Sequence, residues 1–396
     1  MTDRLYYTDA YCTTFEATVT RALEHGGRPA VVLDRTAFYP ASGGQPCDTG
    51  RLGAANVVEV VDGPEIVHVV SSPLAAGSAV TGAIDWARRF DHMQQHTGQH
   101  VLSAAFVRLF ENATVGFHLG AEASTIDLAR EAARRDVERA VDLANDVMWE
   151  NRAVSVELVS QEEAARRALR KDPAREGPLR LIDIERFDTC PCGGTHVART
   201  GGVGMVAVLG TERLRGGTRL TFVCGGRALE ALRTFRDAVT GSVRTLSVPP
   251  AELPAAVARL HGDAKDLQKR LRELKTRLAA SDGARLLEHA RERGGVRVAV
   301  EVLSDAEAGD LKTLALAATA AGRAAVVLLS SAAPVAVVVA RSDGVALDAG
   351  AMLRQLVERF GGRGGGRIDL AQGGGLEATA SEVAAAAGEM LARALG

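Results

Sequence analysis

Two short segments carry histidine and cysteine at spacings that suit metal binding. They are His96-Thr-Gly-Gln-His100 and Cys192-Gly-Gly-Thr-His196. Side chains four residues apart lie on one face of a helix, so His96 and His100 can bind one ion together. The second segment follows Pro191 and contains two glycines, which permit a tight loop that folds a thiolate and an imidazole onto the same ion. Three imidazoles and one thiolate are ligands that zinc prefers, so we expect one Zn²⁺ per chain.

Two further residues are alternative ligands. His92 continues the histidine face of the expected helix, but positions 92 and 100 lie about 12 Å apart at 1.5 Å per residue, so one ion cannot use both. We therefore choose His96 with His100 and give His92 a supporting or surface role. Cys190 competes with Cys192, and the spacing alone does not decide between them. Four protein ligands are typical of a structural site, whereas three ligands and a water form a catalytic site, so both uses stay open.

The first half of the chain is expected to fold as α+β. Residues 1–85 contain short β-like runs separated by Gly, Pro and Asp, which predict a small β-barrel. A zinc-binding domain is then expected over residues 86–245. Its first helix runs from Trp86 to about Phe110, with Asp85 as the N-cap. A second helix over Asp127 to Glu150 is followed by the Cys192 loop and by strands at Gly204 to Leu209 and Thr218 to Cys224.

The second half begins at a boundary marked by three prolines. Beyond it, apolar residues recur with 3,4 spacing at Val257, Leu260, Ala264, Leu267, Leu271, Leu274 and Leu278. This seam predicts a short coiled coil within residues 250–292, which either pairs two chains into a homodimer or folds back on a helix near Ala284 to Arg291. Residues 294–396 alternate strands with Ala-rich helices, which predicts a small α/β domain.

These motifs together resemble a known family. The His96-x3-His100 and Cys192-x3-His196 pairs are similar to the zinc signature of the alanyl-tRNA synthetase editing domain and of its free-standing relatives, the AlaX proteins. The segment Thr36-Ala-Phe-Tyr-Pro-Ala-Ser-Gly-Gly-Gln45, with Asp48-Thr-Gly50, resembles the N-terminal editing motif. The glycine-rich segment from Gly361 to Gly375 resembles the C-terminal domain of alanyl-tRNA synthetases. Four motifs in the family's order span most of the chain.

The resemblance implies a zinc-dependent hydrolase that acts in trans and has no aminoacylation domain. It would cleave the ester that joins a wrong amino acid, chiefly serine and also glycine, to the tRNA for alanine. A site that hydrogen-bonds the serine hydroxyl can reject alanine, and Thr36 and Gln45 of the matched motif are the candidate readers. The Gly43-Gly44 turn is the candidate donor to the developing oxyanion. Thr97 follows His96, so the glutamate base of an HExxH peptidase is absent.

Contacts with tRNA should be local, because the formal net charge of the chain is only -2. Aromatic residues make up 4% of the chain, which disfavours a base-stacking platform as the main mode of recognition. The resemblance implies that the C-terminal domain binds tRNA and helps to form dimers. The candidate tRNA-binding residues of both halves are Arg213, Arg215, Arg219, Arg363, Arg367 and Gln372.

Composition places the chain among reduced, cytoplasmic proteins. Its five cysteines are scattered, and no apolar run is long enough to span a bilayer. Two other classes remain as alternatives. One is a non-catalytic tRNA- or synthetase-binding protein with a structural zinc. The other is a DHH-type phosphoesterase relative, whose C-terminal domain has a similar glycine-rich segment, but this chain offers only Asp91-His92-Met93 and no cluster of aspartates.

Overall fold

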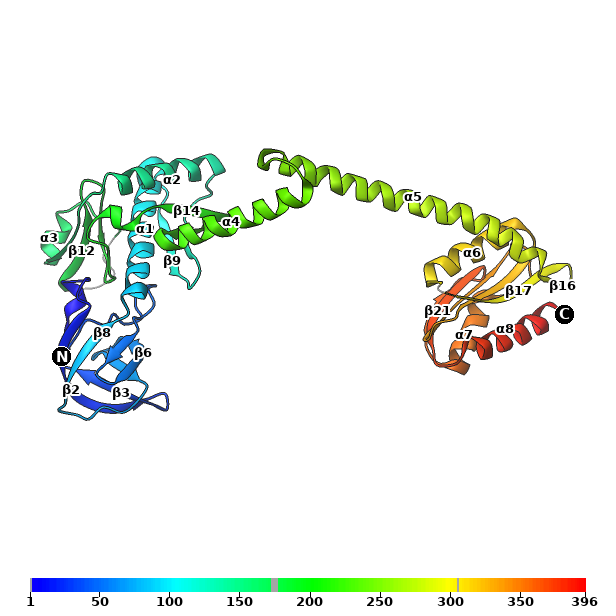
Figure 1. The fold of residues 1–396 in the computed structure, drawn as a ribbon, viewed down its shortest axis with the longest axis horizontal. Helices are drawn as coiled ribbons and strands as arrows, with labels where there is room; N and C mark the ends of the chain where they lie inside the picture. The colour runs from blue at the N-terminus through cyan, green and yellow to red at the C-terminus, as the bar shows by residue number, and fades with distance from the viewer. Residues whose placement is uncertain (1, 172–176, 305) are drawn as a thin grey trace. The chain divides into compact units, whose positions relative to one another are not determined.

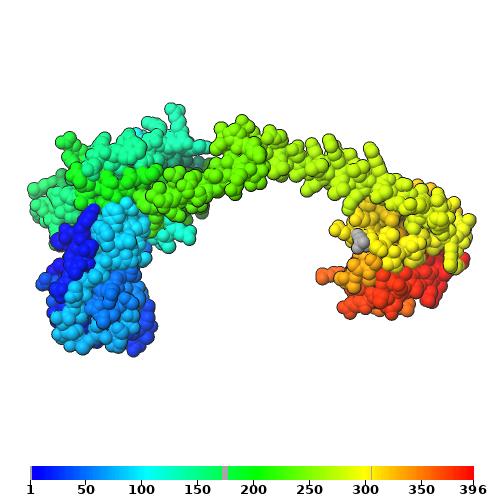
Figure 2. Space-filling view, in the orientation of Figure 1, coloured from blue at the N-terminus to red at the C-terminus, as the bar shows by residue number. Residues whose placement is uncertain are grey.

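The computed structural model describes residues 2–171, 177–304 and 306–396. The chain divides into two compact units, Met1–Ser242 and Val243–Gly396, and the predicted α+β class is confirmed (Figure 1). Within the first unit the barrel, drawn in blue, packs against the cyan and green segments (Figure 2). No helix in the described ranges is both long and apolar enough to cross a membrane. The finer domain bounds expected from the sequence stay predictions.

A closed six-stranded barrel forms the N-terminal part of the first unit, as the short β-rich runs predict. The strands pair in the order β2-β3-β7-β6-β5-β8, and every pairing is antiparallel. Side chains on alternate positions fill the interior, and closure leaves no free sheet edge. The strand bounds are β2 (Thr14–His25), β3 (Arg28–Leu33), β5 (Gly50–Leu52), β6 (Ala55–Val61), β7 (Val67–Val70) and β8 (Ala79–Ile84). Beside the barrel, β1 (Asp3–Arg4) pairs with β4 (Arg35–Thr36), and the 3-10 turn η1 (Leu5–Tyr7) follows β1.

A buried histidine in the barrel should make stability depend on pH. His68 Nε2 lies 2.8 Å from Thr36 Oγ1, and its Nδ1 lies 3.3 Å from the Val31 carbonyl oxygen. Burial lowers the pKa of His68 from 6.5 to about 4, so between these values only the unfolded chain binds the proton. The stabilisation is therefore complete above pH 6.5 and is lost as the pH falls toward 4. From this residue alone we expect the unfolding free energy of the metal-free protein to fall by about 2–3 kcal/mol between pH 7 and pH 4.5.

The variant His68→Gln isolates this contribution, because glutamine can still bond Thr36 but does not titrate. Urea unfolding gives the difference in unfolding free energy between the variant and the natural protein. This difference should shift in favour of the variant by about 2–3 kcal/mol when the pH is lowered from 7 to 4.5. An identical difference at both pH values would show that His68 does not cause the pH dependence.

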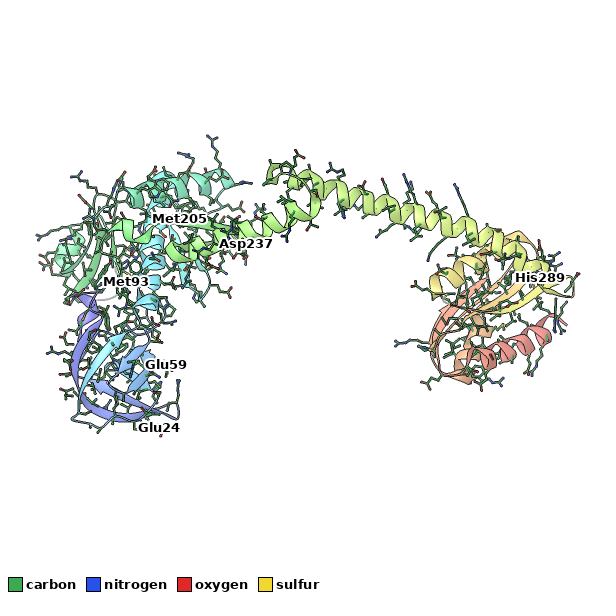
Figure 3. The ribbon with its side chains drawn as sticks, in the orientation of Figure 1. Glu24, Glu59, Met93, Met205, Asp237 and His289 are labelled. Atoms are coloured by element: carbon green, nitrogen blue, oxygen red, sulfur yellow. The ribbon has the colours of Figure 1, made fainter. Side chains whose placement is uncertain are left out.

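Helix α1 (Trp86–Phe110) is the central element of the first unit, and its predicted cap is confirmed. The Asp85 carboxylate accepts a hydrogen bond from the Arg88 backbone N–H at 3.2 Å. The middle of α1 is buried, including Met93 (Figure 3). A Cβ on Gly98 would lie 2.2 Å from Cys224 Sγ, so a glycine is needed where α1 crosses the sheet. This sheet has the order β14-β15-β10-β9, with β9 (Thr114–Leu119), β10 (Ser124–Leu128), β14 (Val206–Leu214) and β15 (Gly217–Cys224).

The start of the second helix, predicted at Asp127, is wrong by several residues. Asp127 and Leu128 belong to β10, and α2 begins only at Arg134 and ends at Trp149. The β-branched Thr125 and Ile126 favour a strand here, and pairing with β15 stabilises it. A third sheet, of β11 (Val154–Val159), β12 (Leu179–Ile184) and β13 (Asp188–Pro191), leads directly into the loop at Cys192. The short helix α3 (Gln161–Ala165) follows β11, η2 (Thr200–Val203) precedes β14, and α4 (Gly225–Leu246) follows β15.

The second unit begins with a long helix. After η3 (Pro250–Glu252), α5 runs without a break over Leu253–Glu288. The predicted alternative of a fold-back on a helix near Ala284 to Arg291 is therefore wrong, because Ala284 lies inside α5. Pro254 stands in the first turn, where its missing N–H costs no helical hydrogen bond. The apolar seam is exposed in this single chain, from Val257 at 52% to Leu278 at 63%, and its pairing as a coiled coil stays a prediction.

A six-stranded sheet completes the second unit and confirms the predicted α/β domain. Val327 and Leu329 of β18 pack with α7 and α8, whereas Val326 and Leu328 face α6 on the other side (Figure 1). The helices are α6 (Ala308–Ala321), α7 (Ala349–Phe360) and α8 (Ala380–Leu395). The strands are β16 (Arg291–Arg293), β17 (Val296–Leu303), β18 (Ala324–Ser330), β19 (Val335–Arg341), β20 (Arg363–Gly366) and β21 (Leu370–Leu376). The glycine-rich segment is thus a hairpin of β20 and β21 within the sheet.

Candidate metal centre

The two histidine-containing motifs meet in the first unit. The ligand atoms of His96, His100, Cys192 and His196 all lie within 4.8 Å of one another. Cys192 Sγ lies 3.3 Å from His96 Nε2 and 3.4 Å from His196 Nε2. Tetrahedral ligands bound at 2.0–2.3 Å are separated by about 3.5 Å, so these distances suit a shared ion. Within the described ranges this is the one such group of three or more His, Cys, Asp or Glu side chains that could hold a metal.

The loop after β13 reaches α1 because of a glycine and an arginine. A Cβ on Gly194 would lie 2.2 Å from His96 Cε1, so only glycine allows this close approach. Arg180, on the neighbouring strand β12, donates from Nη1 to the carbonyl oxygens of Cys192 at 2.8 Å and Gly194 at 2.9 Å. The Gly194 N–H in turn points at Cys192 Sγ, 3.4 Å away. Hydrogen bonds within the protein therefore hold the loop in this conformation.

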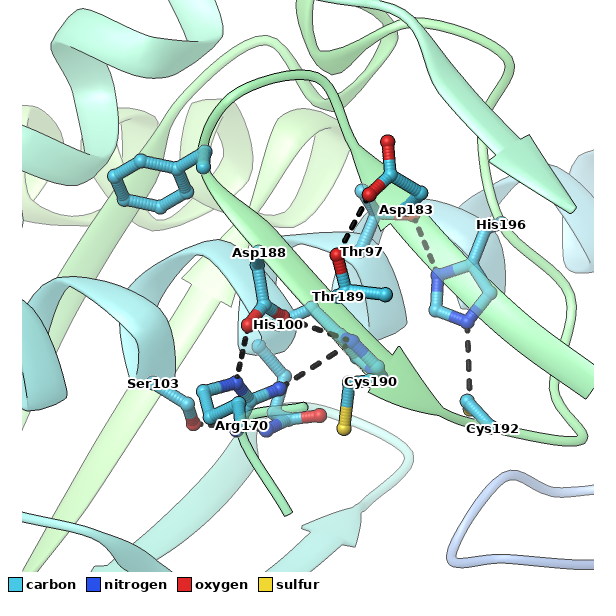
Figure 4. A network of polar contacts seen from close by, with 12 residues as sticks. Thr97, His100, Ser103, Arg170, Asp183, Asp188, Thr189, Cys190, Cys192 and His196 are labelled. Atoms are coloured by element: carbon cyan, nitrogen blue, oxygen red, sulfur yellow. Dashed lines mark hydrogen bonds and ion pairs between the residues drawn. The ribbon is translucent and has the colours of Figure 1, made fainter. Parts of the chain in front are cut away.

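Hydrogen bonds at Nδ1 turn two of the imidazoles so that Nε2 faces the cluster. His96 Nδ1 lies 2.8 Å from Gln45 Oε1. His196 Nδ1 lies 3.1 Å from Thr97 Oγ1 (Figure 4). Gln45 Oε1 also accepts from the Thr195 N–H at 3.2 Å. Partners of this kind set the tautomer and the ring orientation of metal-binding histidines.

The third imidazole lies beside a buried ion pair. Arg170 Nε donates to Asp188 Oδ1 at 2.7 Å, while Arg170 Nη2 and Asp188 Oδ2 lie 3.4 Å and 3.7 Å from His100 Nδ1 (Figure 4). Burial acts to raise the pKa of Asp188, but His100 and Arg170 outweigh it and lower this pKa. Asp188 therefore stays a carboxylate paired with Arg170, and the His100 imidazole lies beside this ion pair.

Ionisation separates the two competing cysteines. Burial raises the pKa of Cys190 to about 11. Burial acts in the same direction on Cys192, but His100, the Gly194 N–H and the Arg180 charge outweigh it and lower the pKa of this thiol. Burial and the charge of Arg180 lower the pKa of His96 to about 3. Metal ligands must be a thiolate and neutral imidazoles, so the chemistry of the cluster fits a metal and favours Cys192 over Cys190.

Removing the Gln45 amide should weaken metal binding. In Gln45→Leu, His96 loses its Nδ1 partner and can adopt the wrong tautomer, so we expect affinity for zinc, the ion predicted from the sequence, to fall about 10- to 100-fold. Competition with a chromophoric chelator measures this. Gln94→Leu is the matched control, because Gln94 bonds the Gly202 carbonyl oxygen at 3.0 Å rather than a cluster histidine. Equal affinities of the two variants would rule out this role of Gln45.

The residues predicted as hydroxyl readers and oxyanion donors occupy different places. Thr36 is fully buried in the barrel and bonds His68, and Gln45 has 2% exposure and bonds His96 and Thr195. Gly43 and Gly44 form a tight turn with φ of +58° and +85°, closed by hydrogen bonds between Ser42 and Gln45. Positive φ at both positions defines a type I′ turn, which favours glycine.

Two cavities meet at the cluster. The larger measures about 370 Å³ and the smaller about 240 Å³. His96 and Cys192 line both, together with Gly43, Lys171 and Pro191. The candidate ligands His96 and Cys192 can therefore be reached from two sides.

The predicted tRNA-binding residues lie outside this site. Arg213 and Arg219 pair with Glu131 at 2.8 Å and with Asp127 at 2.7 Å, and Arg215 stands in the turn between β14 and β15. In the second unit, Arg363 and Gln372 lie on the β20–β21 hairpin, and Arg367 between these strands pairs with Asp369 at 3.2 Å. His92 is buried, lies outside the metal group and has no hydrogen-bond partner for Nδ1 among the described residues.

Several residues of the site were not found from the sequence. They are Arg170, Arg180 and Asp188, which hold the loop or face His100, and Arg89 of α1, whose buried guanidinium bonds Asp48. Only Arg89 left a signal, since it shares a helix face with Met93, His96 and His100 and is the one cation in that stripe.

Three family models match the chain. The model for the class II (A) tRNA synthetases matches residues 2–88, that for the threonyl and alanyl tRNA synthetase second additional domain matches residues 179–220, and that for the DHHA1 domain matches residues 295–394. The alanine–tRNA ligase of Pyrococcus abyssi is 35% identical over 94% of this chain and 42% of its own length. That of Halobacterium salinarum is 36% identical, over 95% and 42% respectively.

This chain thus spans less than half the length of these curated relatives. Among solved structures, the C-Ala domain from Aquifex aeolicus alanyl-tRNA synthetase is 25% identical, with a TM-score of 0.24, and the match covers 27% of this chain and 96% of that one.

Proposed function

This chain belongs to the family of alanyl-tRNA synthetases and their AlaX-type editing relatives, and from that premise we propose that it is a zinc-dependent aminoacyl-tRNA hydrolase. Its substrate is the tRNA for alanine carrying a wrong amino acid, chiefly serine and also glycine. The observation that carries the proposal is the cluster of His96, His100, Cys192 and His196 at the meeting point of two cavities. A cofactor in this position touches whatever occupies both cavities.

Each residue near the cluster has a role in this proposal. His96, His100, Cys192 and His196 hold the zinc ion. Bound zinc supplies Lewis-acid chemistry that polarises a carbonyl group or a water molecule. The N–H groups of Gly43 and Gly44 make no hydrogen bond within the described residues, and Gly43 lines both cavities. The Gly43 N–H can donate to the ester oxygen as this oxygen gains negative charge.

Discrimination of serine from alanine fits the smaller cavity. Its wall includes Gln99 and Thr114, which are linked through Ser103: Gln99 Nε2 donates to Ser103 Oγ at 2.8 Å, and Ser103 Oγ lies 2.7 Å from Thr114 Oγ1. These polar groups line the cavity, whereas Thr36 and Gln45 line neither cavity, so Gln99 and Thr114 suit a substrate hydroxyl better. A buried site built for a hydroxyl rejects the analogue that lacks it.

The rival functions receive less support. Four protein ligands are usual for a structural zinc, but a purely structural site has no need of two open cavities on its ligands. Asp91 is paired with Arg227 at 2.6 Å, and no second metal-type cluster occurs in the described ranges, which speaks against a manganese phosphoesterase. Pairing of chains through the α5 seam, tRNA contacts by the arginines and a cytoplasmic location accompany the proposal as predictions.

The direct test follows release of radiolabelled serine from seryl-tRNA(Ala) by the purified, zinc-loaded chain. Alanyl-tRNA(Ala) and correctly charged seryl-tRNA(Ser) serve as controls. We expect serine to leave tRNA(Ala) at least about 100-fold faster than alanine. Tight binding of tRNA(Ala) without release of serine would identify a binding protein with a structural zinc instead.

A further inference from the structure

The end of β13 carries a second cysteine that the proposed hydrolysis does not use. Cys190 lies in β13 opposite Ile182 of β12. The pairing continues beyond the strand, because the Cys192 N–H donates to the Arg180 carbonyl oxygen at 3.1 Å. Residues two positions apart in an extended chain face the same side of a sheet, so Cys190 and Cys192 share a face. Together with Pro191 they line the smaller cavity.

The separation of these two cysteines suits a disulfide bond. Two residues of extended chain span about 6.6 Å between Cα atoms, and disulfides join Cα atoms that lie about 4.4–6.8 Å apart. The Cys190 thiol donates only a long hydrogen bond, to the Pro191 carbonyl oxygen at 3.7 Å. The other cysteines of the chain, Cys12, Cys47 and Cys224, line neither cavity. Cys190 is therefore the thiol best placed to meet Cys192.

Small oxidants can reach Cys192 from both cavities. These cavities measure about 370 Å³ and 240 Å³, so a reagent little larger than a water molecule fits in either. A cysteine that binds zinc does so as a thiolate, which is also the form that reacts with peroxides. An oxidised cysteine that lies beside a second thiol forms a disulfide with it, whereas one without such a neighbour is oxidised further and irreversibly. The neighbour therefore decides whether oxidation of Cys192 can be reversed.

We propose that Cys190 is the thiol that closes a reversible disulfide with Cys192 when hydrogen peroxide oxidises the site. The Cys192 thiolate attacks one peroxide oxygen, so that an S–O bond forms, the O–O bond breaks and hydroxide leaves. The Cys190 sulfur then attacks the Cys192 sulfur: the S–S bond forms, the S–O bond breaks, and the departing hydroxide takes the Cys190 proton to become water. The two sulfurs lose two electrons, which the peroxide gains. The metal loses its thiolate ligand and is released. This inference rests on the ligand set of the proposed function.

The test treats the zinc-loaded full chain with hydrogen peroxide while a chromophoric chelator reports the released zinc. Free thiols are then blocked and the chain is digested with trypsin, which cleaves after Arg186 and Arg199, so one peptide contains both cysteines. In the natural chain we expect zinc to be released and this peptide to lack two hydrogen atoms by mass spectrometry. In Cys190→Ala, peroxide should instead convert Cys192 to the sulfinic or sulfonic acid. Zinc binding recovered after dithiothreitol should therefore be at least about fivefold lower in this variant than in the natural chain.

Cys47→Ala is the matched control, because Cys47 is a partly exposed thiol that lines neither cavity, and it should recover zinc binding as the natural chain does. The inference is wrong if peroxide leaves the zinc bound, if Cys190→Ala recovers as fully as the natural chain, or if Cys192 is linked to a cysteine other than Cys190. None of these readouts requires hydrolysis. A chain that forms the reversible disulfide without releasing serine supports the inference and overturns only the enzyme. A chain that releases serine but recovers no zinc binding after peroxide overturns only the inference.

Discussion

Replacing Cys192 with alanine is expected to remove the bound zinc and to lower serine release from seryl-tRNA(Ala) at least about 100-fold. The reason is that, in the proposed zinc site, this thiolate is the one anionic ligand, and its Sγ lies 3.3–3.4 Å from two of the imidazole Nε2 atoms. Losing even an outer partner of a ligand costs about 10- to 100-fold in metal affinity or activity, so losing a ligand should cost more. Metal content by mass spectrometry and initial rates of release measure the two effects.

Cys190→Ala is the control for this experiment. Cys190 lies two residues away, is 4% exposed and has a pKa raised to about 11 by burial, so it should be a thiol that packs rather than a ligand. We expect this variant to keep one zinc per chain and a rate within about threefold of the natural protein, since only a small cavity is created. If Cys190→Ala lost the metal while Cys192→Ala kept it, the ligand assignment would be reversed. A Cys192→Ala variant with full zinc and full activity would instead reveal a site of three histidines.

The four candidate ligands could be picked out from the sequence because their spacing is local, and the structure brings their side chains together. His96 and His100 share a helix face whatever the tertiary fold is, and Pro191 with two glycines indicates the tight Cys192 loop. The same holds for α1, whose Asp85 cap lies next to its first residue, and for the strands of the barrel and of the C-terminal sheet. Short-range periodicity is sufficient for such elements.

The partners of the ligands could not be predicted, because they come from distant segments. Gln45 stands 51 residues before His96 in the chain, and Thr97 stands 99 residues before His196. Only the packing of the turn, the helix and the loop brings them together. For the same reason the sequence motif suggested Thr36 as a reader of substrate, whereas the barrel uses its hydroxyl to bond His68.

The glycine-rich segment shows a different limit. β20 and β21 form a sheet hairpin in which Gly364 packs over Gly373. A Cβ on Gly364 would lie 2.6 Å from the Gly373 Cα. Glycine there serves strand-to-strand contact, which a periodicity search cannot separate from ligand contact.

A buried ion pair joins the two halves of the candidate site. Arg89 of α1 and Asp48 of the segment after the Gly43-Gly44 turn contact each other, and both side chains are 0% exposed. Arg89 also donates to the Ala10 carbonyl oxygen at 2.8 Å, and Asp48 accepts from the Tyr39 N–H at 2.6 Å. The pair therefore ties the helix that carries His96 to the segment that carries Gln45.

Arg89→Met is expected to lower the unfolding free energy of the first unit by about 3–5 kcal/mol, because it leaves the Asp48 carboxylate buried without its partner. Arg219→Met is the matched control. Arg219 pairs with Asp127 at 2.7 Å, but the two side chains are 39% and 21% exposed, so its loss should cost less than about 1 kcal/mol. Urea unfolding of both variants in the presence of a chelator gives the comparison without a metal contribution.

Adding Asp48→Asn to Arg89→Met should recover part of the loss, since the neutral amide still accepts from Tyr39 and no longer buries a charge. If Arg89→Met costs no more than Arg219→Met, the buried pair does not stabilise the unit. Measuring the zinc affinity of the folded Arg89→Met variant extends the test to the site. If the segment with Gln45 is released from α1, His96 loses its oriented Nδ1 partner. The zinc affinity should then fall as it does in Gln45→Leu. Stability lost with zinc affinity retained would mean that the ion pair supports the barrel alone.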